Sequence, residues 1–500
     1  MMIGYDSAFI GGTIALPSFK ADFGLDRITQ DQFNLISANI VSFYQMGCFL
    51  GALFAYPLGH FYGRRKSLLI SVLIFLIGAI FMTISNRSNG LSLIYVGRVF
   101  TGFGIGIVSS ITPIYIAEIS IPSIRGRLIG LYELGWQIGG IIGFWINYGV
   151  SQNPRIKSQQ QYLIPFAIQL LPAGICLIGL ISYLKESPRW LLSRGRKDEA
   201  LNSLCWIRNS IQDDPLIQNE FSIMESSLEK QNEQLGNSFW APFEKLLFHR
   251  PLLTRLMIAG SLFIFQNGTG INAINYYSPT VFASIGVTGT SSALLSTGVF
   301  GAIKTIATLF WLFFLADAID RTTMLMFGAF FGGLMMYGLG AYIAIVKPTE
   351  NPSLDGLRPS GKGALAMFYL WTVFYSPTWN PTPWVWAAEA FPMHVRTLSQ
   401  SFVASSNWLF NFLIARFTPQ MFTSMGYGVY IFFASFMMIS IPFVWFIVPE
   451  LRGIPLEMID EVFENWNPRK GKRFNQTSFQ LVQHSSLKID QIQQIDHDQD

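Results

Sequence analysis

The sequence is poor in charge and in cysteine for a chain of 500 residues. Charged side chains make up only 13% of it, and the net charge of +4 is too small to indicate a nucleic-acid-binding surface. The three cysteines, Cys48, Cys176 and Cys205, lie far apart, so we expect neither a disulfide framework nor a cysteine metal site. A phosphate-binding glycine loop, metal-spaced histidines and a nucleophile with a nearby base are also missing. We therefore expect no enzyme activity, no cofactor, no metal ion and no nucleic-acid partner.

Apolar residues are what the chain has in excess. They make up 51% of the sequence, aromatic residues make up 15%, and the mean hydropathy is +0.37. A soluble protein of this composition would expose a large apolar surface to water. About twelve membrane spans of roughly 20 residues, with their loops, account for the length instead. The hydropathy predicts an all-α membrane protein with spans near residues 1–16, 33–58, 68–84, 91–117, 128–149, 163–184, 253–282, 293–316, 324–346, 364–388, 398–420 and 426–448.

The first predicted span is unusual. It begins at Met1 and contains Asp6. It has about 16 apolar residues, where roughly 20 are needed to cross a bilayer. A secretory signal peptide would begin with basic residues, and this segment has none. We therefore expect the first helix to be truncated at its start.

Charged signatures occur twice, once in each half of the chain, beside apolar spans. The clearest is a glutamate followed seven residues later by an arginine, at Glu118 and Arg125 and again at Glu389 and Arg396. Two further pairs are Gly63-Arg64-Arg65-Lys66 with Asp317-Ala318-Ile319-Asp320-Arg321, and Glu186-Ser187-Pro188-Arg189 with Glu450-Leu451-Arg452-Gly453. Parallel repeats of six spans are typical of transporters whose halves rock about a central site. The repeat predicts two six-helix halves.

The expected halves are residues 1–184 and 252–448. Residues 185–251 are polar with helix-forming stretches, and we interpret them as a linker outside the bilayer. Residues 449–500 are expected to form a largely disordered tail, because they are too poor in apolar residues to build a core. Lysine and arginine are concentrated in the linker and in the loops on its side, which predicts cytoplasmic termini. We expect a multi-pass protein of the plasma membrane that functions as a monomer.

Four motifs give the sequence a family resemblance. They are Gly63-Arg64-Arg65-Lys66, Glu186-Ser187-Pro188-Arg189-Trp190, the run 266–272 with Tyr276-Tyr277, and Pro449-Glu450-Leu451-Arg452-Gly453. Through them, residues 1–463 resemble the sugar porter family of the major facilitator superfamily, and the stretches 3–11 and 132–140 are most similar to fungal quinate permeases. The resemblance implies the major facilitator fold, with twelve transmembrane helices in two six-helix repeats, and transport by alternating access.

The repeated charges lie at predicted helix ends on the linker side. Ion pairs between arginine and carboxylate there would hold neighbouring spans in one state, and would have to break when that side opens. We therefore predict a gating network. The alternative is that these charges only set the topology and are solvated. The predicted members are Arg65, Glu118, Arg125, Arg127, Glu186, Arg189, Arg321, Glu389, Arg396 and Glu450.

Four ionisable residues lie inside predicted spans: Asp6, Arg98, Glu133 and Lys304. A charge at the centre of a membrane helix costs about 2.5–3.5 kcal/mol, so each is a candidate for function. By the family resemblance, Asp6 matches the proton-coupling aspartate of proton-linked sugar porters, and Arg98 matches its partner. Protonation of Asp6 would release Arg98, because a carboxylate beside arginine favours its charged form. The alternative is a static structural ion pair.

Lys304 is the single residue that says most about the charge of the substrate. It lies near the centre of the span 293–316, at helical spacing from Thr297 and Thr308. A neutral sugar requires no cation there, whereas a polyhydroxy acid such as quinate or a uronic acid would find its counter-ion in Lys304. The alternative is an internal pair between Lys304 and Glu133, which stands where sugar-binding relatives usually have glutamine.

Uncharged polar residues complete the expected site. Gln137 lies one turn from Glu133, and amides both donate and accept, as vicinal hydroxyl groups require. The family resemblance implies that Gln266, Asn267 and Asn272 line the substrate cavity, and that Trp384 and Asn407 are ligands from later spans. Pro381 and Pro383 precede Trp384 and are expected to break its helix. The expected substrate-binding set is Glu133, Gln137, Gln266, Asn267, Asn272, Lys304, Trp384 and Asn407.

The predicted function is proton symport of a polyhydroxylated, quinate-like acid by alternating access. Its expected partners are the small substrate, protons and the lipid bilayer. Two alternatives stay open: a neutral hexose or polyol porter, in which Lys304 only neutralises Glu133, and a nutrient sensor that signals through its tail. The charge of the transported substrate distinguishes the acid symporter from the neutral porter. Deletion of the tail tests the sensor, because transport should survive it.

Overall fold

A computed structural model describes residues 1–500 apart from 87, 122–124, 154–155, 157–158, 236–238, 316–317, 352–356, 453–458, 460–462 and 464–500. The side chains of 125–127, 129, 230–235 and 393–394 are not described either. The predicted gating contacts of Arg125 and Arg127, and the predicted disorder of most of the tail, therefore lie outside the described residues. The described part of the chain is helical and contains no strand.

The helices follow one another in two groups of similar length, separated by short linker helices. The first group is α1 (Met2–Ala15), α2 (Pro17–Asp22), α3 (Gln30–Phe61), α4 (Arg64–Thr83), α5 (Ser92–Ile119), α6 (Arg125–Gln152), α7 (Gln159–Ile168) and α8 (Leu170–Ser182). The linker forms α9 (Pro188–Ser193), α10 (Lys197–Arg208), α11 (Pro215–Leu235) and α12 (Ala241–Phe248). The second group is α13 (Arg250–Gly268), α14 (Ile271–Ile285), α15 (Thr290–Phe310) with the π-helical turn η2 (Trp311–Leu315), α16 (Arg321–Val346), α17 (Pro359–Tyr375), α18 (Thr382–Ala390), α19 (Met393–Met425) and α20 (Gly428–Ile447).

Each of the expected spans coincides with one helix or with a pair of helices separated by a short break. Within the described residues, 7 helices are long and apolar enough to cross a membrane by length and composition, or up to 8 if the bent helices α12, α13 and α14 count as one span. The remaining spans are short (α1), broken (α17 with α18) or richer in polar residues (α6 and α19). These exceptions are the helices that carry much of the polar site.

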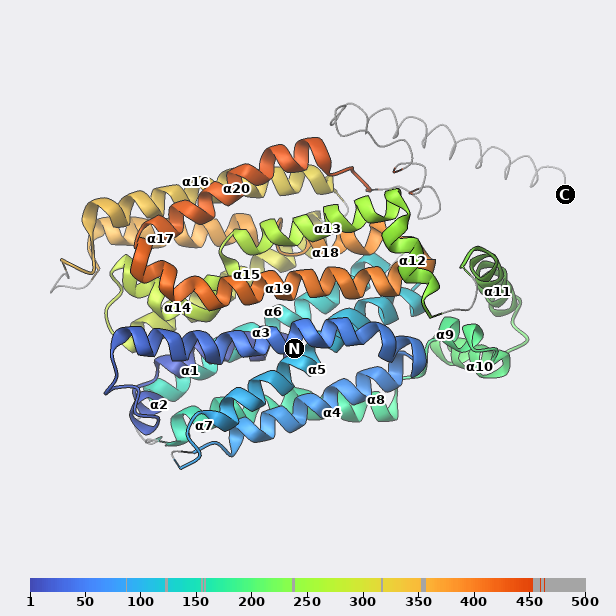
Figure 1. Ribbon diagram of the computed structural model, residues 1–500, viewed down its shortest axis with the longest axis horizontal. Coiled ribbons are helices and arrows are strands. Elements are labelled where there is room, and N and C mark those ends of the chain that lie inside the picture. The colour runs from blue at the N-terminus through green and yellow to red at the C-terminus, as the bar shows by residue number, and fades with distance from the viewer. Residues whose placement is uncertain are drawn as a thin grey trace.

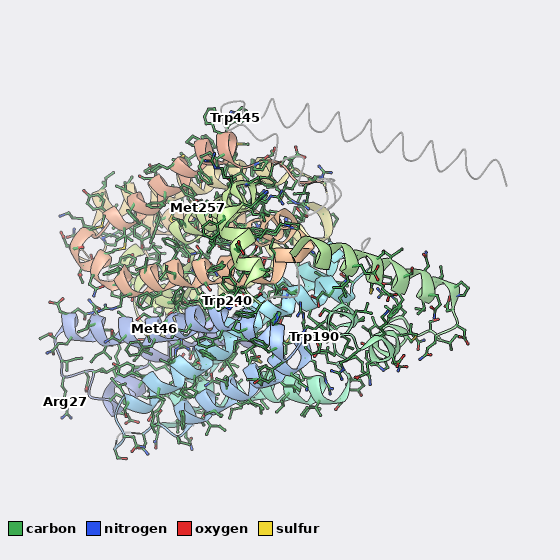
Figure 2. The ribbon with its side chains drawn as sticks, turned by 45° about the vertical axis from the view of Figure 1, so that its right-hand side comes forward. Arg27, Met46, Trp190, Trp240, Met257 and Trp445 are labelled. Atoms are coloured by element: carbon green, nitrogen blue, oxygen red, sulfur yellow. The ribbon has the colours of Figure 1, made fainter. Side chains whose placement is uncertain are left out.

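The two groups lie side by side with their helices running along the long axis (Figure 1). They meet where α3 packs on α19, α6 on α15 and α1 on α14. The linker helices α9 to α11 lie at one end of the bundle, where Figure 2 shows Trp190, and Arg27 lies at the opposite end. We call these the linker end and the vestibule end.

Two interruptions of the helices, which we call breaks, lie in the second group near the middle of the bundle. Gly270 adopts a φ of +88°, a conformation that glycine reaches without steric cost, and it separates α13 from α14. Residues 376–381 separate α17 from α18, and Pro381 lacks the amide hydrogen that would continue a helix. Breaks of this kind leave backbone carbonyls available to buried side chains.

The outside of the bundle is apolar, as a membrane requires. Ile175, Ile306 and Phe313 expose 71%, 66% and 72% of their surface. Burial of apolar surface is worth about 25 cal/mol per Å² in water, so a water-soluble protein does not leave such side chains facing solvent in large numbers. Lipid removes this cost, and the exterior therefore identifies the lipid-facing surface.

The helices of the first group approach closely where α3 crosses α5. A Cβ atom added at Gly102 on α5 would lie 2.1 Å from the backbone oxygen of Tyr44 on α3, closer than real contacts allow. Small residues permit the same close approach in other membrane helix pairs. The α3–α5 contact therefore requires glycine at position 102.

We expect Gly102→Ala to destabilise the first group by about 1–3 kcal/mol, because the added methyl group forces the two backbones apart. The matched control is Gly149→Ala on α6, where an added Cβ atom meets nothing within 4 Å. The measurement is the melting temperature of each purified variant in detergent. Equal melting temperatures for the two variants would contradict the close packing of α3 on α5.

Candidate functional site

A buried ion pair joins α1 to α5. Arg98 Nη1 lies 2.8 Å from Asp6 Oδ1, and neither side chain has any exposed surface. Arg98 Nε also donates to the backbone oxygen of Ile40 on α3, at 3.1 Å. The guanidinium group lies 4.4 Å from the ring centre of Tyr44, which adds a cation–π contact. These contacts offset part of the cost of burying the arginine charge, while Arg98 Nη2 is buried without a hydrogen-bond partner among the described residues.

The second oxygen of Asp6, Oδ2, is buried without a hydrogen-bond partner among the described residues. A carboxylate normally accepts several hydrogen bonds, so this oxygen retains acceptor capacity. An oxygen of this kind can take up a proton without breaking another contact. The geometry thus permits protonation of Asp6 in place.

A second buried carboxylate lies on α6, close to the boundary between the two groups. Glu133 is 8% exposed. Its Oε1 atom accepts a hydrogen bond from Gln137 Nε2 at 2.6 Å and another from Asn380 Nδ2 at 2.7 Å. Asn380 belongs to the break between α17 and α18, so the second bond crosses the boundary between the halves.

Lys304 on α15 faces the same region and is 7% exposed. It attracts Glu133 electrostatically. In the part of the chain that the structure describes, however, its ammonium group forms no ion pair and no hydrogen bond. A cavity of about 20 Å³ lies beside it, lined also by Ser7 and Gln137. That volume suits a single water molecule.

Amide side chains form a connected cluster around the break after α13. Asn267 Nδ2 donates to Asn407 Oδ1 on α19 at 3.1 Å and to the backbone oxygen of Phe263 at 2.8 Å. Asn272 Nδ2 donates to Asn267 Oδ1 at 2.6 Å. The structure therefore brings three of the predicted substrate-binding residues into one hydrogen-bonded group.

The other predicted ligands of the second half lie nearby. Gln266 Nε2 donates to the backbone oxygens of Trp379 and Asn380, at 2.8 and 2.9 Å. Trp384 packs edge-on against Phe263, with ring centres 4.7 Å apart. It also lines a second cavity of about 20 Å³ together with Glu133. Glu133, Gln137, Lys304 and Trp384 thus lie at the boundary between the halves, Gln266 holds the segment that carries Asn380, and the Asn267 cluster lies next to Gln266.

Charged contacts lie at the linker end of the first half. Arg64 Nη2 lies 2.6 Å from Glu118 Oε1 and 3.3 Å from Thr397 Oγ1 on α19, so one guanidinium group contacts both halves. Arg65, which the sequence reasoning chose, instead donates to the backbone oxygens of Leu180 and Ile181 at the end of α8. The pairing residue at this position is Arg64.

The second half repeats this arrangement. Arg321 Nη2 donates to Glu389 Oε1 at 3.2 Å, as Arg64 does to Glu118. Arg396 donates to the backbone oxygen of Phe391. The repeated sequence signatures therefore become repeated contacts.

Glutamates cap equivalent helices in the two halves. Glu186 accepts from the backbone nitrogen of Arg64 at 2.7 Å, at the start of α4. Glu450 accepts from the backbone nitrogen of Thr322 at 2.9 Å, at the start of α16. A carboxylate stabilises a helix N-terminus by satisfying free amides and by its charge. Each cap ties the segment that follows its half to the third membrane span of that half, α4 or α16.

Arg189 lies in α9 beside these contacts. Burial lowers the pKa of its guanidinium group, and the nearby carboxylates of Glu118 and Glu220 oppose that shift. Arg189 therefore belongs to the same electrostatic cluster as Glu118. This places a linker residue next to the contact between Arg64 and Glu118.

The vestibule end is hollow. A cavity of about 680 Å³ opens there between the two halves, lined by residues of α1, α3, α14, α15 and α19. Tyr276 and Tyr277 belong to its wall. Among the described residues, charged contacts join the halves at the linker end, the large cavity opens at the opposite end, and cavities of about 20 Å³ lie at the polar site between them.

Comparison with known proteins agrees with this architecture. The family model described as sugar (and other) transporter matches residues 1–463. The chain belongs to the sugar transporter family. It is therefore a membrane transporter with the major facilitator fold, and not an enzyme.

Two curated relatives of this sugar transporter are quinate permeases. The probable quinate permease of Aspergillus niger is 54% identical over 463 residues, which are 93% of this chain and 85% of the relative. The quinate permease of Emericella nidulans is 53% identical over 463 residues, 93% of this chain and 86% of the relative.

Solved structures of xylose transporters share the fold. The proton:xylose symporter XylE bound to 6-bromo-6-deoxy-D-glucose has a TM-score of 0.77 and 25% identity, covering 92% of this chain and 96% of that one. The inward-open xylose transporter XylE of E. coli has a TM-score of 0.71 and 23% identity, with coverage of 92% and 96%.

Sequence reasoning about this sugar transporter missed two residues that the structure places at the centre of its contacts. Arg64 lies in the repeated basic signature, but the sequence predicts its neighbour Arg65 as the member of the gating network. One feature of the sequence could have pointed to Asn380. It directly precedes Pro381, and proline is expected to break the helix there. Its contact with Glu133 follows only from the packing of α6 against the break.

Arg64→Ala should loosen the linker end, because it removes the contacts of one guanidinium group with Glu118 and Thr397. Hydrogen bonds to charged groups contribute about 1.5–3 kcal/mol, which corresponds to roughly tenfold or more in an opening equilibrium. Hydrogen exchange measured by mass spectrometry should therefore speed up at least tenfold in the last turn of α5 and the first turns of α19.

The matched control is Arg65→Ala, which leaves both contacts of Arg64 in place. We expect its effect on the same peptides to be at least threefold smaller than that of Arg64→Ala. Equal exchange in the two variants would show that Arg64 does not hold this end closed.

Proposed function

We propose that this chain is a proton symporter of a polyhydroxylated carboxylic acid of the quinate type. The observation that carries the proposal is the state of Lys304. It is a buried cation in the polar site, it forms no ion pair with any described residue, and a small cavity lies beside it. A buried charge of this kind is costly unless an anion neutralises it. The carboxylate of a substrate would supply that anion.

The relatives support this choice of substrate. Proteins described as quinate permeases are 53–54% identical to this chain over nearly its whole length. Quinate carries a carboxylate together with several hydroxyl groups, so it requires one cation and several amides. The site offers both in one place.

In the proposed binding mode, both halves contribute ligands. Lys304 of the second half binds the carboxylate, while Glu133 and Gln137 of the first half bind hydroxyl groups. The remaining hydroxyl groups would be bound by the amide cluster of Gln266, Asn267, Asn272 and Asn407, and the apolar face of the ring would lie on Trp384. A substrate that bridges the halves favours their closure around it.

Asp6 and Arg98 are the proposed proton-coupling pair. Proton uptake by Asp6 would weaken its ion pair with Arg98 and free the guanidinium group to change partners. Because α1 carries both Asp6 and Ser7, and Ser7 lines the cavity of Lys304, proton binding and substrate binding act on the same helix. This connection provides a route for coupling.

The charged contacts at the linker end are the proposed gate. In this proposal the linker end faces the cytoplasm, the halves 1–184 and 252–448 rock about the central site, and the gate opens when those contacts separate. The proposed location is the plasma membrane, with both termini in the cytoplasm and the monomer as the working unit. The vestibule would then face the outside of the cell.

The direct test is uptake of labelled quinate, galacturonate and glucose into cells that express the full chain, with and without a proton uncoupler. Uptake of an acid that the uncoupler abolishes is the expected result. Uptake of glucose alone would overturn the proposal and favour a neutral sugar porter, in which the attraction between Lys304 and Glu133 merely neutralises two buried charges. Uptake of an acid that is insensitive to the uncoupler would overturn the proton coupling only.

Lys304→Gln should raise the KM for the acid by roughly tenfold to a hundredfold, because it removes a charge-assisted contact worth about 1.5–3 kcal/mol. Competition by neutral sugars, measured in the same cells, should change by less than threefold. An unchanged KM for the acid would rule out Lys304 as the carboxylate ligand.

Asp6→Asn should uncouple transport from the proton gradient, because a carboxamide does not ionise at physiological pH and so cannot bind and release the coupled proton. Concentrative uptake should fall at least tenfold, while exchange of substrate across the membrane persists. The matched control is Asp198→Asn in the exposed part of the linker, which should behave like the unmutated chain. Concentrative uptake by Asp6→Asn would contradict the assigned role.

A further inference from the structure

Asn380 is a polar residue at the centre of the molecule to which the sequence assigned no role. It lies in the break between α17 and α18 and is 9% exposed. Its side-chain nitrogen donates to Glu133 Oε1 across the boundary between the halves, at 2.7 Å. A hydrogen bond from an amide to a buried carboxylate is a strong one, since the acceptor is charged.

The backbone around Asn380 is held in place from two sides. Its amide nitrogen donates to the backbone oxygen of Tyr375 at 3.3 Å, and its carbonyl oxygen accepts from Gln266 Nε2 at 2.9 Å. Gln266 also binds the carbonyl oxygen of Trp379. The break is therefore fixed to α13, and it presents the Asn380 side chain to Glu133 in a defined position.

Glu133 stands between two kinds of partner. The amides of Gln137 and Asn380 both donate to its Oε1 atom, while Lys304 attracts its charge without forming an ion pair in the structure. If one amide is removed, part of the solvation of the carboxylate is lost. When Asn380 is the amide removed, Gln137 still donates to Glu133, and the ammonium group of Lys304 is the nearby charge that can replace the lost solvation.

We propose that Asn380 is a positioning residue that determines specificity for an acid. By holding Glu133, it prevents that carboxylate from forming an ion pair with Lys304, and so keeps the ammonium group available for the carboxylate of the substrate. Without Asn380, Glu133 occupies Lys304, and the substrate acid meets a neutral pair. The inference rests on the proposed function, because it concerns the same substrate and the same lysine.

The test combines two positions. Asn380→Ala, measured by uptake of labelled quinate into cells, should raise the KM at least tenfold and change kcat by less than threefold. In a Glu133→Gln background the same change should alter the KM by less than twofold, because the substituted amide carries no charge with which to occupy Lys304. A purely structural role for Asn380 would produce the same loss in both backgrounds.

Two further variants serve as a substitute for Asn380→Ala and as a control. Asn380→Leu also lacks the donor but fills most of the space, so it carries the test if Asn380→Ala does not fold, as judged by size-exclusion chromatography. Thr382→Val is the matched control, since Thr382 lies in the next turn, is 1% exposed, and its hydroxyl group has no hydrogen-bond partner among the described residues. It should leave the KM unchanged.

The outcomes separate the inference from the proposed function. If the unmutated chain takes up no acid, the proposed function fails and the inference fails with it. If the unmutated chain takes up the acid, and the loss in Asn380→Ala is below twofold or persists in the Glu133→Gln background, only the inference is overturned. A loss that Glu133→Gln suppresses supports it.

Discussion

The arrangement of polar residues in this transporter depends on the free-energy cost of burying charge in an apolar bundle. Asp6 and Arg98 have no exposed surface, and each supplies an ion-pair partner for the other. Glu133 is satisfied by two amides, one from each half. Lys304 is the exception, since it is buried without an ion-pair partner among the described residues. The ammonium group of Lys304 is therefore the basis of the proposed specificity for an anionic substrate.

The same constraint gives the two ends their different character. At the linker end, arginine and glutamate from duplicated signatures form equivalent contacts in both halves, and Arg64 also reaches Thr397 across the boundary. At the vestibule end a cavity of about 680 Å³ separates the halves. The side chains of Arg64 and Glu118 are 10% and 12% exposed, so in the proposed gate water can replace each partner when the contact separates during transport.

The spans were predictable because hydropathy and length are local properties. The positions of the predicted spans agree with the helices, including those broken at Gly270 and before Pro381, where glycine and proline act on their own backbone. Side-chain partners were less predictable. Arg64 and Arg65 differ by about 100° around one helix, so which of them faces Glu118 depends on the rotation of α4 against α5. Asn380 contacts Glu133 only because residues 247 positions apart meet across the boundary between the halves.

By itself, the sequence determined the membrane class, the two-fold repeat, the family and the set of buried ionisable residues, because each follows from composition, spacing or motif. Only the tertiary structure decided which carboxylate is held by which donor, that Lys304 is left without an ion-pair partner in the described part of the chain, and which end is open. These facts depend on how helices distant in sequence rotate and cross, and on which lone pairs and protons meet within about 3 Å. No pattern along the chain carries that information.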